Sequence, residues 1–174
     1  MRNLFIKLKT GLITALNQLL IVAVLVLVLD VVWGVFTRYV LGNQAQWTEE
    51  LARFMLIWIS LLGGAVAFGL KGHLGVDFLV EKFHPDAKKM TAMAVHATVL
   101  IFSVVIFIYG GSRVVADALT MEQTTPAMGW KMGYVYLALP VSGLFMLLFS
   151  IENLIQTIIT SSASTEATSI GGLD

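Results

Sequence analysis

The side chains with the most chemical potential are charged and aromatic residues at the start of a long apolar run: Trp47, Glu49, Glu50, Arg53 and Trp58. Thr48 is predicted to be a helix N-cap, because its hydroxyl can accept a hydrogen bond from a free N–H of the first turn. Glu49 and Glu50 then lie where the helix dipole favours negative charge, and Arg53 can share their face. Two roles stay open for this group: docking of a soluble partner, or capping and orienting of the helix.

Two further ionisable residues lie inside apolar runs. Asp30 interrupts an aliphatic run, and an acid there costs about 2.5–3.5 kcal/mol on insertion scales, so it must face protein, water or a partner. It can act as a proton or cation relay or as an intramembrane polar lock between helices, and the lock is favoured because no second acid stands at matching depth. His96 would ligate haem only with a second histidine on a facing crossing, whereas His73 and His84 stand in a connection.

Composition identifies the class of protein. Of the 174 residues, 57% are hydrophobic and 13% are charged, whereas soluble domains average about 25% charged. The chain is therefore predicted to be an integral membrane protein. The absence of cysteine excludes disulfides and thiolate metal sites, and a net charge of zero gives no basic field for nucleic acid. No G-x-x-x-x-G-K-[ST] phosphate loop is present, so ATP hydrolysis by that route is excluded.

Apolar stretches long enough to cross a bilayer, about 20 residues each, predict an all-α fold with four transmembrane helices. We expect one transmembrane domain over residues 1–160, and its crossings at about 16–41, 48–70, 90–112 and 131–156. The basic and then apolar N-terminus reads as an uncleaved membrane anchor. A short interfacial amphipathic helix is predicted between the second and third crossings. Residues 161–174, rich in Ser, Thr and Gly, are predicted to form a disordered cytoplasmic tail.

Small residues and a proline predict how the crossings pack. The pairs Gly63/Ala67 and Ala65/Gly69 have the small-x-x-x-small spacing that lets another helix approach closely. Pro140 is expected to kink the fourth crossing, because its ring clashes with the carbonyl four residues earlier.

Charges at the ends of the crossings predict the orientation. Arg113 and Asp117 are expected to close the third crossing, and Glu152 with Asn153 to form a solvated end of the fourth. If the N-terminus is cytoplasmic, seven Lys and Arg residues lie inside and four outside: Arg2, Lys7, Lys9, Lys71, Lys82, Lys88 and Lys89 against Arg38, Arg53, Arg113 and Lys131. The positive-inside rule therefore favours both termini in the cytoplasm.

Three motifs make this sequence resemble a known family. They are Trp47-x-Glu49-Glu50-x-x-Arg53-x-x-x-x-Trp58, then Lys71-Gly72-His73-Leu74-Gly75-Val76-Asp77, and then Thr125-Pro126-Ala127-Met128-Gly129-Trp130 followed by Tyr134, Tyr136 and Pro140. In this order on a four-helix chain, they resemble the small membrane subunit (small permease, DctQ-like) of tripartite ATP-independent periplasmic (TRAP) transporters. The resemblance covers roughly residues 47–143.

The resemblance implies a multi-pass protein of the bacterial inner membrane that partners a large permease subunit. That large subunit would carry the sodium and substrate sites, so no cofactor and no enzymatic activity are implied for this chain. A periplasmic substrate-binding protein would deliver an organic acid, such as a four-carbon dicarboxylate or sialic acid. The small subunit would be a static scaffold while the transport domain of the large subunit moves as an elevator.

Carried over residue by residue, the family-motif positions are Trp47, Glu49, Glu50, Arg53, Trp58, Gly72, His73, Val76 and Asp77. The outer rim formed by residues 47–53 and 113–130 is expected to lie near the dock for the binding protein. One departure is visible, since Lys131 stands where a proline is common in the family pattern.

Two alternatives come from other functional classes. The first is an autonomous small channel or proton-coupled carrier that uses Asp30 as its relay. The second is a haem-binding membrane anchor of a redox enzyme, with His96 as a ligand. The family resemblance favours the transporter subunit over both.

Overall fold

The computed structural model describes residues 2–43, 45–70 and 85–170, and within them the regular secondary structure is helical apart from one isolated β-bridge between Thr124 and Lys131. The elements are α1 (Arg2–Tyr39), α2 (Gln46–Gly69), α4 (Pro85–Phe102), the π-helix η1 (Ser103–Gly110), α5 (Gly111–Thr120), α6 (Met132–Tyr136) and α7 (Ala138–Ile170). A helix satisfies its own backbone polar groups, which is what an apolar segment needs in lipid.

Four stretches of helix are long and apolar enough to cross a membrane: Lys9–Tyr39, Gln46–Gly69, Ala94–Thr120 and Met132–Leu154. The predicted all-α fold with four crossings is therefore confirmed. The third crossing continues past its expected end, so Arg113 and Asp117 lie within α5 and do not terminate the helix. Its apolar face continues through buried Val115 and Ala118, which explains why two charges do not end it.

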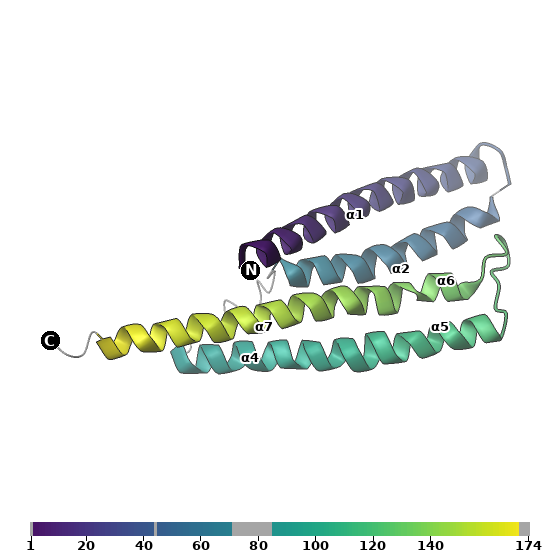
Figure 1. Cartoon of the computed structure of the whole chain (residues 1–174). Coiled ribbons are helices and arrows are strands. Elements are labelled where there is room, and N and C mark those ends of the chain that lie inside the picture. The colour runs from purple at the N-terminus through teal and green to yellow at the C-terminus, as the bar shows by residue number, and fades with distance from the viewer. Residues whose placement is uncertain (1, 44, 71–84, 171–174) are drawn as a thin grey trace.

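The helices lie side by side in a layer, in the order α1, α2, α7 and the continuous rod of α4, η1 and α5 (Figure 1). The chain therefore does not close into a four-helix ring. The described contacts of α1 are chiefly with α2, and α2 lies between α1 and α7. This leaves α1 at one edge of the layer.

The core lies where α1, α2 and α7 meet, around Leu16, Leu62, Val66 and Phe149. The predicted small-residue face is half right. Ala65 is fully buried, and Gly69 faces Phe149 so closely that an added Cβ would lie 2.8 Å from the ring. In contrast, Gly63 has open space beside it and Ala67 is exposed, so this pair packs against no described helix.

The fourth crossing is interrupted as Pro140 predicts. The helix α6 ends at Tyr136 and α7 begins at Ala138. Pro140 has no N–H to donate to the Tyr136 carbonyl, so the regular ladder of backbone hydrogen bonds fails there. Next to the break Gly111 of α5 is in close contact with α7, since an added Cβ would lie 2.8 Å from Leu139 Cβ.

The π-helix η1 is the element that the sequence did not predict. Its backbone repeats over eight residues with the wider π spacing, whereas π-helices are rare and mostly single-turn bulges. It packs against α7 at Gly143, where an added Cβ would lie 2.5 Å from Phe107 Cβ. A glycine is therefore needed on α7 for this rod to approach.

Two predicted segments remain, the C-terminal tail and the interfacial helix. The tail predicted to be disordered over residues 161–174 is helical as far as Ile170, because α7 continues without a break. The predicted interfacial helix lies outside the described residues, and so do the motif positions Gly72, His73, Val76 and Asp77. The start of α1 and the end of α7 lie towards the same end of the layer (Figure 1), and the compartment that this end faces stays a prediction.

Candidate functional site

The best-defined polar contact is the one between Glu50 and the loop that joins α5 to α6. One carboxylate oxygen of Glu50 accepts a hydrogen bond from the Ala127 N–H at 2.9 Å, and the other accepts one from the Met128 N–H at 3.0 Å. This pair of bonds joins the first family motif, at the start of α2, to the third. A carboxylate that accepts two backbone N–H groups in parallel fixes both the position and the orientation of the loop.

The loop itself is tied by Thr125. The Thr125 N–H donates to the Trp130 carbonyl at 2.9 Å, and the Thr125 hydroxyl accepts from the Trp130 N–H at 3.1 Å. Gly129 closes the turn with a φ of +65°, a conformation that glycine adopts without strain. Thr125 is buried, and its hydrogen bonds to Trp130 close the loop. Glu50 therefore binds a turn that also has hydrogen bonds of its own.

The start of α2 corrects the predicted N-cap. The helix begins at Gln46 with Ala45 as its N-cap, so Thr48 lies inside the first turn. Its hydroxyl donates to the Ala45 carbonyl at 2.7 Å instead of accepting from a free N–H. The reason is packing: Thr48 is buried against Gly34 of α1, where an added Cβ would lie 3.0 Å from the Thr48 hydroxyl oxygen.

The turn between α1 and α2 is closed by a residue that sequence reasoning missed. Thr37 is buried, donates through its hydroxyl to the Gly34 carbonyl at 3.0 Å and accepts from the Ala45 N–H at 3.3 Å. A threonine that bonds to neighbouring backbone groups is a recurrent turn former, which is the local signal that could have identified it.

The remaining motif side chains point to different neighbours. Trp58 is half-buried and packs against the core cluster, whereas Trp47 is exposed. Arg53 is exposed, and its positive charge acts on the Glu50 carboxylate from a distance. Glu49 instead lines a groove against α1. The expected shared face of two acids and one arginine is therefore divided between a loop contact and a groove.

Asp30 lies in that groove. It is only 6% exposed, and neither of its carboxylate oxygens has a hydrogen-bond partner in the part of the chain that the structure describes. The predicted polar lock is therefore not formed by the described residues of this chain. The groove has a volume of about 240 Å³ and runs between α1 and the first two turns of α2.

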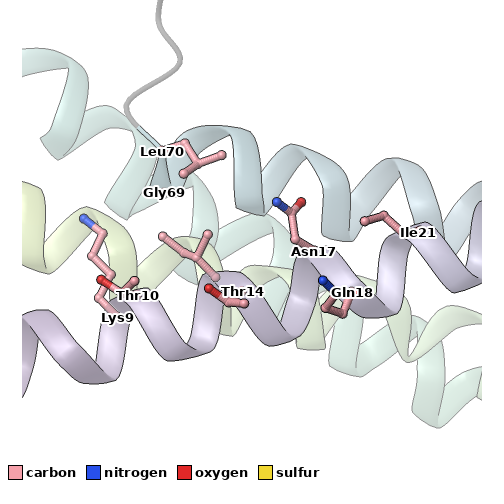
Figure 2. A pocket seen from close by; sticks show the side chains of 9 residues that line it. Lys9, Thr10, Thr14, Asn17, Gln18, Ile21, Gly69 and Leu70 are labelled. Carbon is pink, nitrogen blue, oxygen red and sulfur yellow. The ribbon is translucent and has the colours of Figure 1, made fainter.

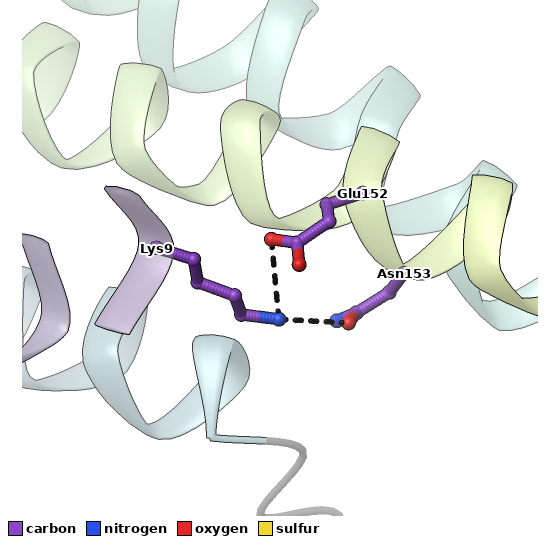
Figure 3. Close-up of polar contacts among 3 residues, drawn as sticks. All are labelled: Lys9, Glu152 and Asn153. Atoms are coloured by element: carbon purple, nitrogen blue, oxygen red, sulfur yellow. Dashed lines mark hydrogen bonds and ion pairs between the residues drawn. The ribbon is translucent and has the colours of Figure 1, made fainter. Parts of the chain in front are cut away.

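A second polar cluster lies near the opposite end of the layer, where Lys9 of α1 meets α7. Its ammonium group lies 3.3 Å from a carboxylate oxygen of Glu152 and donates to the Asn153 side-chain oxygen at 3.3 Å (Figure 3). Asn153 is buried, so the solvated helix end predicted for Glu152 and Asn153 is wrong. The predicted crossings gave no signal for this contact, because the first was expected to begin only at residue 16, after Lys9, whereas Glu152 and Asn153 lie inside the fourth.

Beside this cluster, one face of α1 carries a stripe of polar side chains next to the end of α2, and Figure 2 shows Thr10, Thr14, Asn17 and Gln18 with Gly69 and Leu70. The cavity that they line has a volume of about 510 Å³. Of the lining residues, Gly69 and Leu70 directly precede the segment 71–84 in the sequence, and that segment is outside the described residues.

The described residues offer His96 no histidine partner for haem. Its ring makes an edge contact with Phe68, with ring centroids 6.1 Å apart, and its backbone carbonyl accepts the Ser150 hydroxyl at 2.9 Å. These contacts join α4 to α2 and α7. Among the described residues no group of three or more His, Cys, Asp or Glu side chains is arranged to hold a metal ion.

Comparison with known proteins decides the family. The family model of tripartite ATP-independent periplasmic transporters, DctQ component, matches residues 27–160, which include Asp30, the α2 motif and the Glu50-bound loop. The chain belongs to this family. It is a small permease subunit of the TRAP type, and the resemblance predicted from its three motifs is confirmed.

Curated relatives of this small permease subunit are also transporter components. The sialic acid TRAP transporter small permease protein SiaQ of Vibrio cholerae is 26% identical over 163 residues, which is 91% of this chain and 92% of the relative. A TRAP transporter small permease protein of Haemophilus influenzae is 28% identical over 142 residues, 81% of this chain and 86% of the relative. These relatives are permease subunits and not enzymes, as expected for this chain.

A third relative is a longer permease. The sialic acid TRAP transporter permease protein SiaT of Haemophilus influenzae is 27% identical over 113 residues, which is 65% of this chain but only 18% of that protein. A segment similar to the TRAP small permease subunit is thus part of a much longer permease chain.

Proposed function

We propose that this subunit scaffolds a large membrane permease subunit during sodium-gradient-driven uptake of an organic acid, with a periplasmic substrate-binding protein as the third component. The observation that carries the proposal is the match to a segment that makes up 18% of the SiaT permease protein. Such a relative supports a complex in which the small permease subunit acts together with a larger permease subunit.

The arrangement of helices supports a scaffold. The helix α1 lies at the edge of the layer and exposes large apolar side chains along its length, including Leu19, Leu25, Val32 and Phe36. Bilayer lipid can cover such a surface, and so can another transmembrane protein. Sodium and substrate sites are assigned to the large subunit, and this chain supplies a fixed surface against which that subunit is held.

The end of the layer that carries the Glu50-bound loop is proposed to face the periplasm and the binding protein. Trp47 and Trp130 are exposed there, and aromatic side chains of this kind are enriched where a membrane meets water. The proposed location is the bacterial inner membrane, with both termini in the cytoplasm. The proposed cargo is a carboxylate, either sialic acid, as the names of two relatives suggest, or a related acid such as a dicarboxylate.

Co-expression tests the proposal. The tagged chain is produced with a large TRAP permease subunit from the same organism and is purified in mild detergent. We expect a stable complex, and in proteoliposomes we expect uptake of the carboxylate only with the complex, the binding protein and an inward sodium gradient together. A chain that supports full uptake without any large subunit would refute the scaffold role.

One observation keeps the channel alternative testable: the Asp30 carboxylate beside the groove has no hydrogen-bond partner in the described part of the chain. Liposomes that contain this chain alone distinguish the two functions. The scaffold proposal predicts no proton or cation flux above that of empty liposomes. An autonomous carrier predicts a flux that Asp30→Asn abolishes.

A further inference from the structure

The groove between α1 and α2 has a defined shape. Gly34 and Thr48 bring the two helices together, with only 3.0 Å between the Thr48 hydroxyl oxygen and the position of a Cβ on Gly34. The groove opens beside this contact and is lined by Asp30, Val35 and Arg38 of α1 and by Glu49 of α2. Its volume of about 240 Å³ is several times the roughly 30 Å³ that one water occupies in the liquid, so a long side chain fits.

Charged side chains line the groove. They are two acids, Asp30 and Glu49, and one basic residue, Arg38. Arg38 lies eight residues from Asp30, about 12 Å along the helix, and its guanidinium stacks on the Tyr39 ring at 5.8 Å. Asp30 has no hydrogen-bond partner among the described residues. A positively charged donor at the depth of Asp30 would compensate its carboxylate.

Depth decides the source of this donor. Asp30 lies nine residues before the end of α1 at Tyr39, about 13 Å down the helix axis. Acyl chains carry no donor, and a lipid headgroup amine would have to descend that distance into the apolar layer. A lysine or arginine on a neighbouring transmembrane helix would reach this depth directly, and α1 packs chiefly against α2 among the described elements, so such a helix has access.

We propose that a lysine or arginine side chain from a transmembrane helix of the large permease subunit enters this groove and pairs with Asp30. The inference rests on the proposed function, since it takes the large subunit as the occupant. The groove is then a specific interaction surface: the pair sets the register of the partner helix against α1 and α2. A buried charge whose partner is removed destabilises an interface strongly, which makes the pair measurable.

Site-specific photo-crosslinking in the co-expressed complex tests the position of the partner. A benzophenone amino acid replaces Val35 in the groove or, as a control, Leu29, which is 61% exposed and lies outside the groove. Asp30 stays native in both. We expect Val35 to cross-link to a large-subunit peptide that carries a lysine or arginine, at about tenfold the yield of Leu29.

Charge exchange then tests the pair. We expect Asp30→Lys to lower the fraction of complex retained on the tagged large subunit by about tenfold, and Asp30→Asn to lower it less. Changing the cross-linked basic residue to Asp should restore retention of Asp30→Lys. Failure of this exchange to restore retention overturns the proposal.

The two proposals fail in different ways. If the wild-type complex co-purifies but Val35 cross-links only to lipid or to nothing, this inference is overturned and the scaffold function stands. If the wild-type chain does not bind the large subunit at all, both are overturned. The cross-linking experiment keeps native Asp30. It therefore still tests the position of the partner if an Asp30 variant fails to fold.

Discussion

Glu50 links two segments that lie 77 residues apart in the sequence. Its neighbour Glu49 is on the same turn of α2 but lines the groove beside Asp30. Two adjacent acids therefore contact different parts of the protein, because successive residues of a helix point about 100° apart and cannot both face the same neighbouring segment. A motif with paired acids can thus serve two surfaces at once.

Glu50→Gln should loosen the α5–α6 loop. The amide side chain keeps one acceptor oxygen but presents its NH₂ to the other backbone N–H, so one of the two bonds to Ala127 and Met128 is lost. We expect several-fold faster hydrogen exchange at these two amides in detergent. Glu49→Gln is the matched control and should leave their exchange unchanged. Equal effects of the two variants would show that the loop does not depend on Glu50.

Lys131 illustrates how a departure from a family pattern can leave the backbone intact. Its φ is −69°, which is the value that proline imposes, and none of the backbone hydrogen bonds found in the described loop uses its N–H. The residue that follows is different, since the Met132 N–H donates to the Gln123 carbonyl at 2.8 Å. The loop-to-helix geometry is thus already suited to proline at position 131.

Lys131→Pro should therefore stabilise the isolated chain by about 0.4–1 kcal/mol, because proline restricts the unfolded chain at a position whose native φ it matches. Met132→Pro should destabilise it, because this substitution removes the bond to Gln123. Thermal unfolding in detergent, followed by circular dichroism, measures both. A fall in midpoint for Lys131→Pro that matches the fall for Met132→Pro would contradict the proposed backbone fit.

At the scale of the elements, glycines decide which helix faces pack within the chain. The two faces of α2 differ in packing. Gly69 packs directly against the ring of Phe149, whereas Gly64 has open space around it. The sequence pattern alone could not separate them, because small residues at helical spacing occur on both faces. The open face is available to lipid or to another transmembrane helix.

Alanine at these two positions should have opposite effects. Gly69→Ala is expected to destabilise the isolated chain by about 1–3 kcal/mol, because its Cβ overlaps a ring that is only 2% exposed. Gly64→Ala should be neutral or stabilising by up to about 1 kcal/mol, since alanine favours a helix and meets no neighbour. Equilibrium unfolding of each variant in the same detergent checks both. Equal stabilities would contradict the packing of α2 on α7.

At the scale of the whole molecule, the fold was predictable where it depends on the length of apolar runs. Four crossings follow from the bilayer thickness, and the break before Pro140 follows from one missing N–H. What was missed depends on contacts between distant segments. The pattern within α2 alone favours Thr48 as a cap, whereas in the folded chain Thr48 lies close to Gly34 of α1 and its hydroxyl donates to the Ala45 carbonyl.

The sites divide in the same way. The motif around Glu50 was identified from residue types, but its partner loop could be found only once α2 and α6 were placed together. The ion pair of Lys9 with Glu152 was missed because each residue was interpreted alone at a helix end. The π-helix η1 has no signal in its mostly apolar sequence, since apolar side chains fit either spacing.

The orientation of the molecule is the last property open to a direct test, and the lack of cysteine makes the test clean. Gln123 is exposed in the α5–α6 loop, at the end of the layer opposite the start of α1. We expect Gln123→Cys to react with a membrane-impermeant maleimide on intact spheroplasts, and Asn3→Cys to react only after the membrane is opened.

The physical reason is the distribution of Lys and Arg, since cytoplasmic loops carry the excess of positive charge. The predicted topology assigns seven of these residues to the side of the N-terminus and four to the other side, and an even number of crossings would return the chain to the side where it began. The cysteine-free wild type supplies the labelling background. Labelling of Asn3→Cys but not of Gln123→Cys on intact spheroplasts would invert the orientation, and the Glu50-bound loop would then face the cytoplasm, out of reach of any periplasmic binding protein.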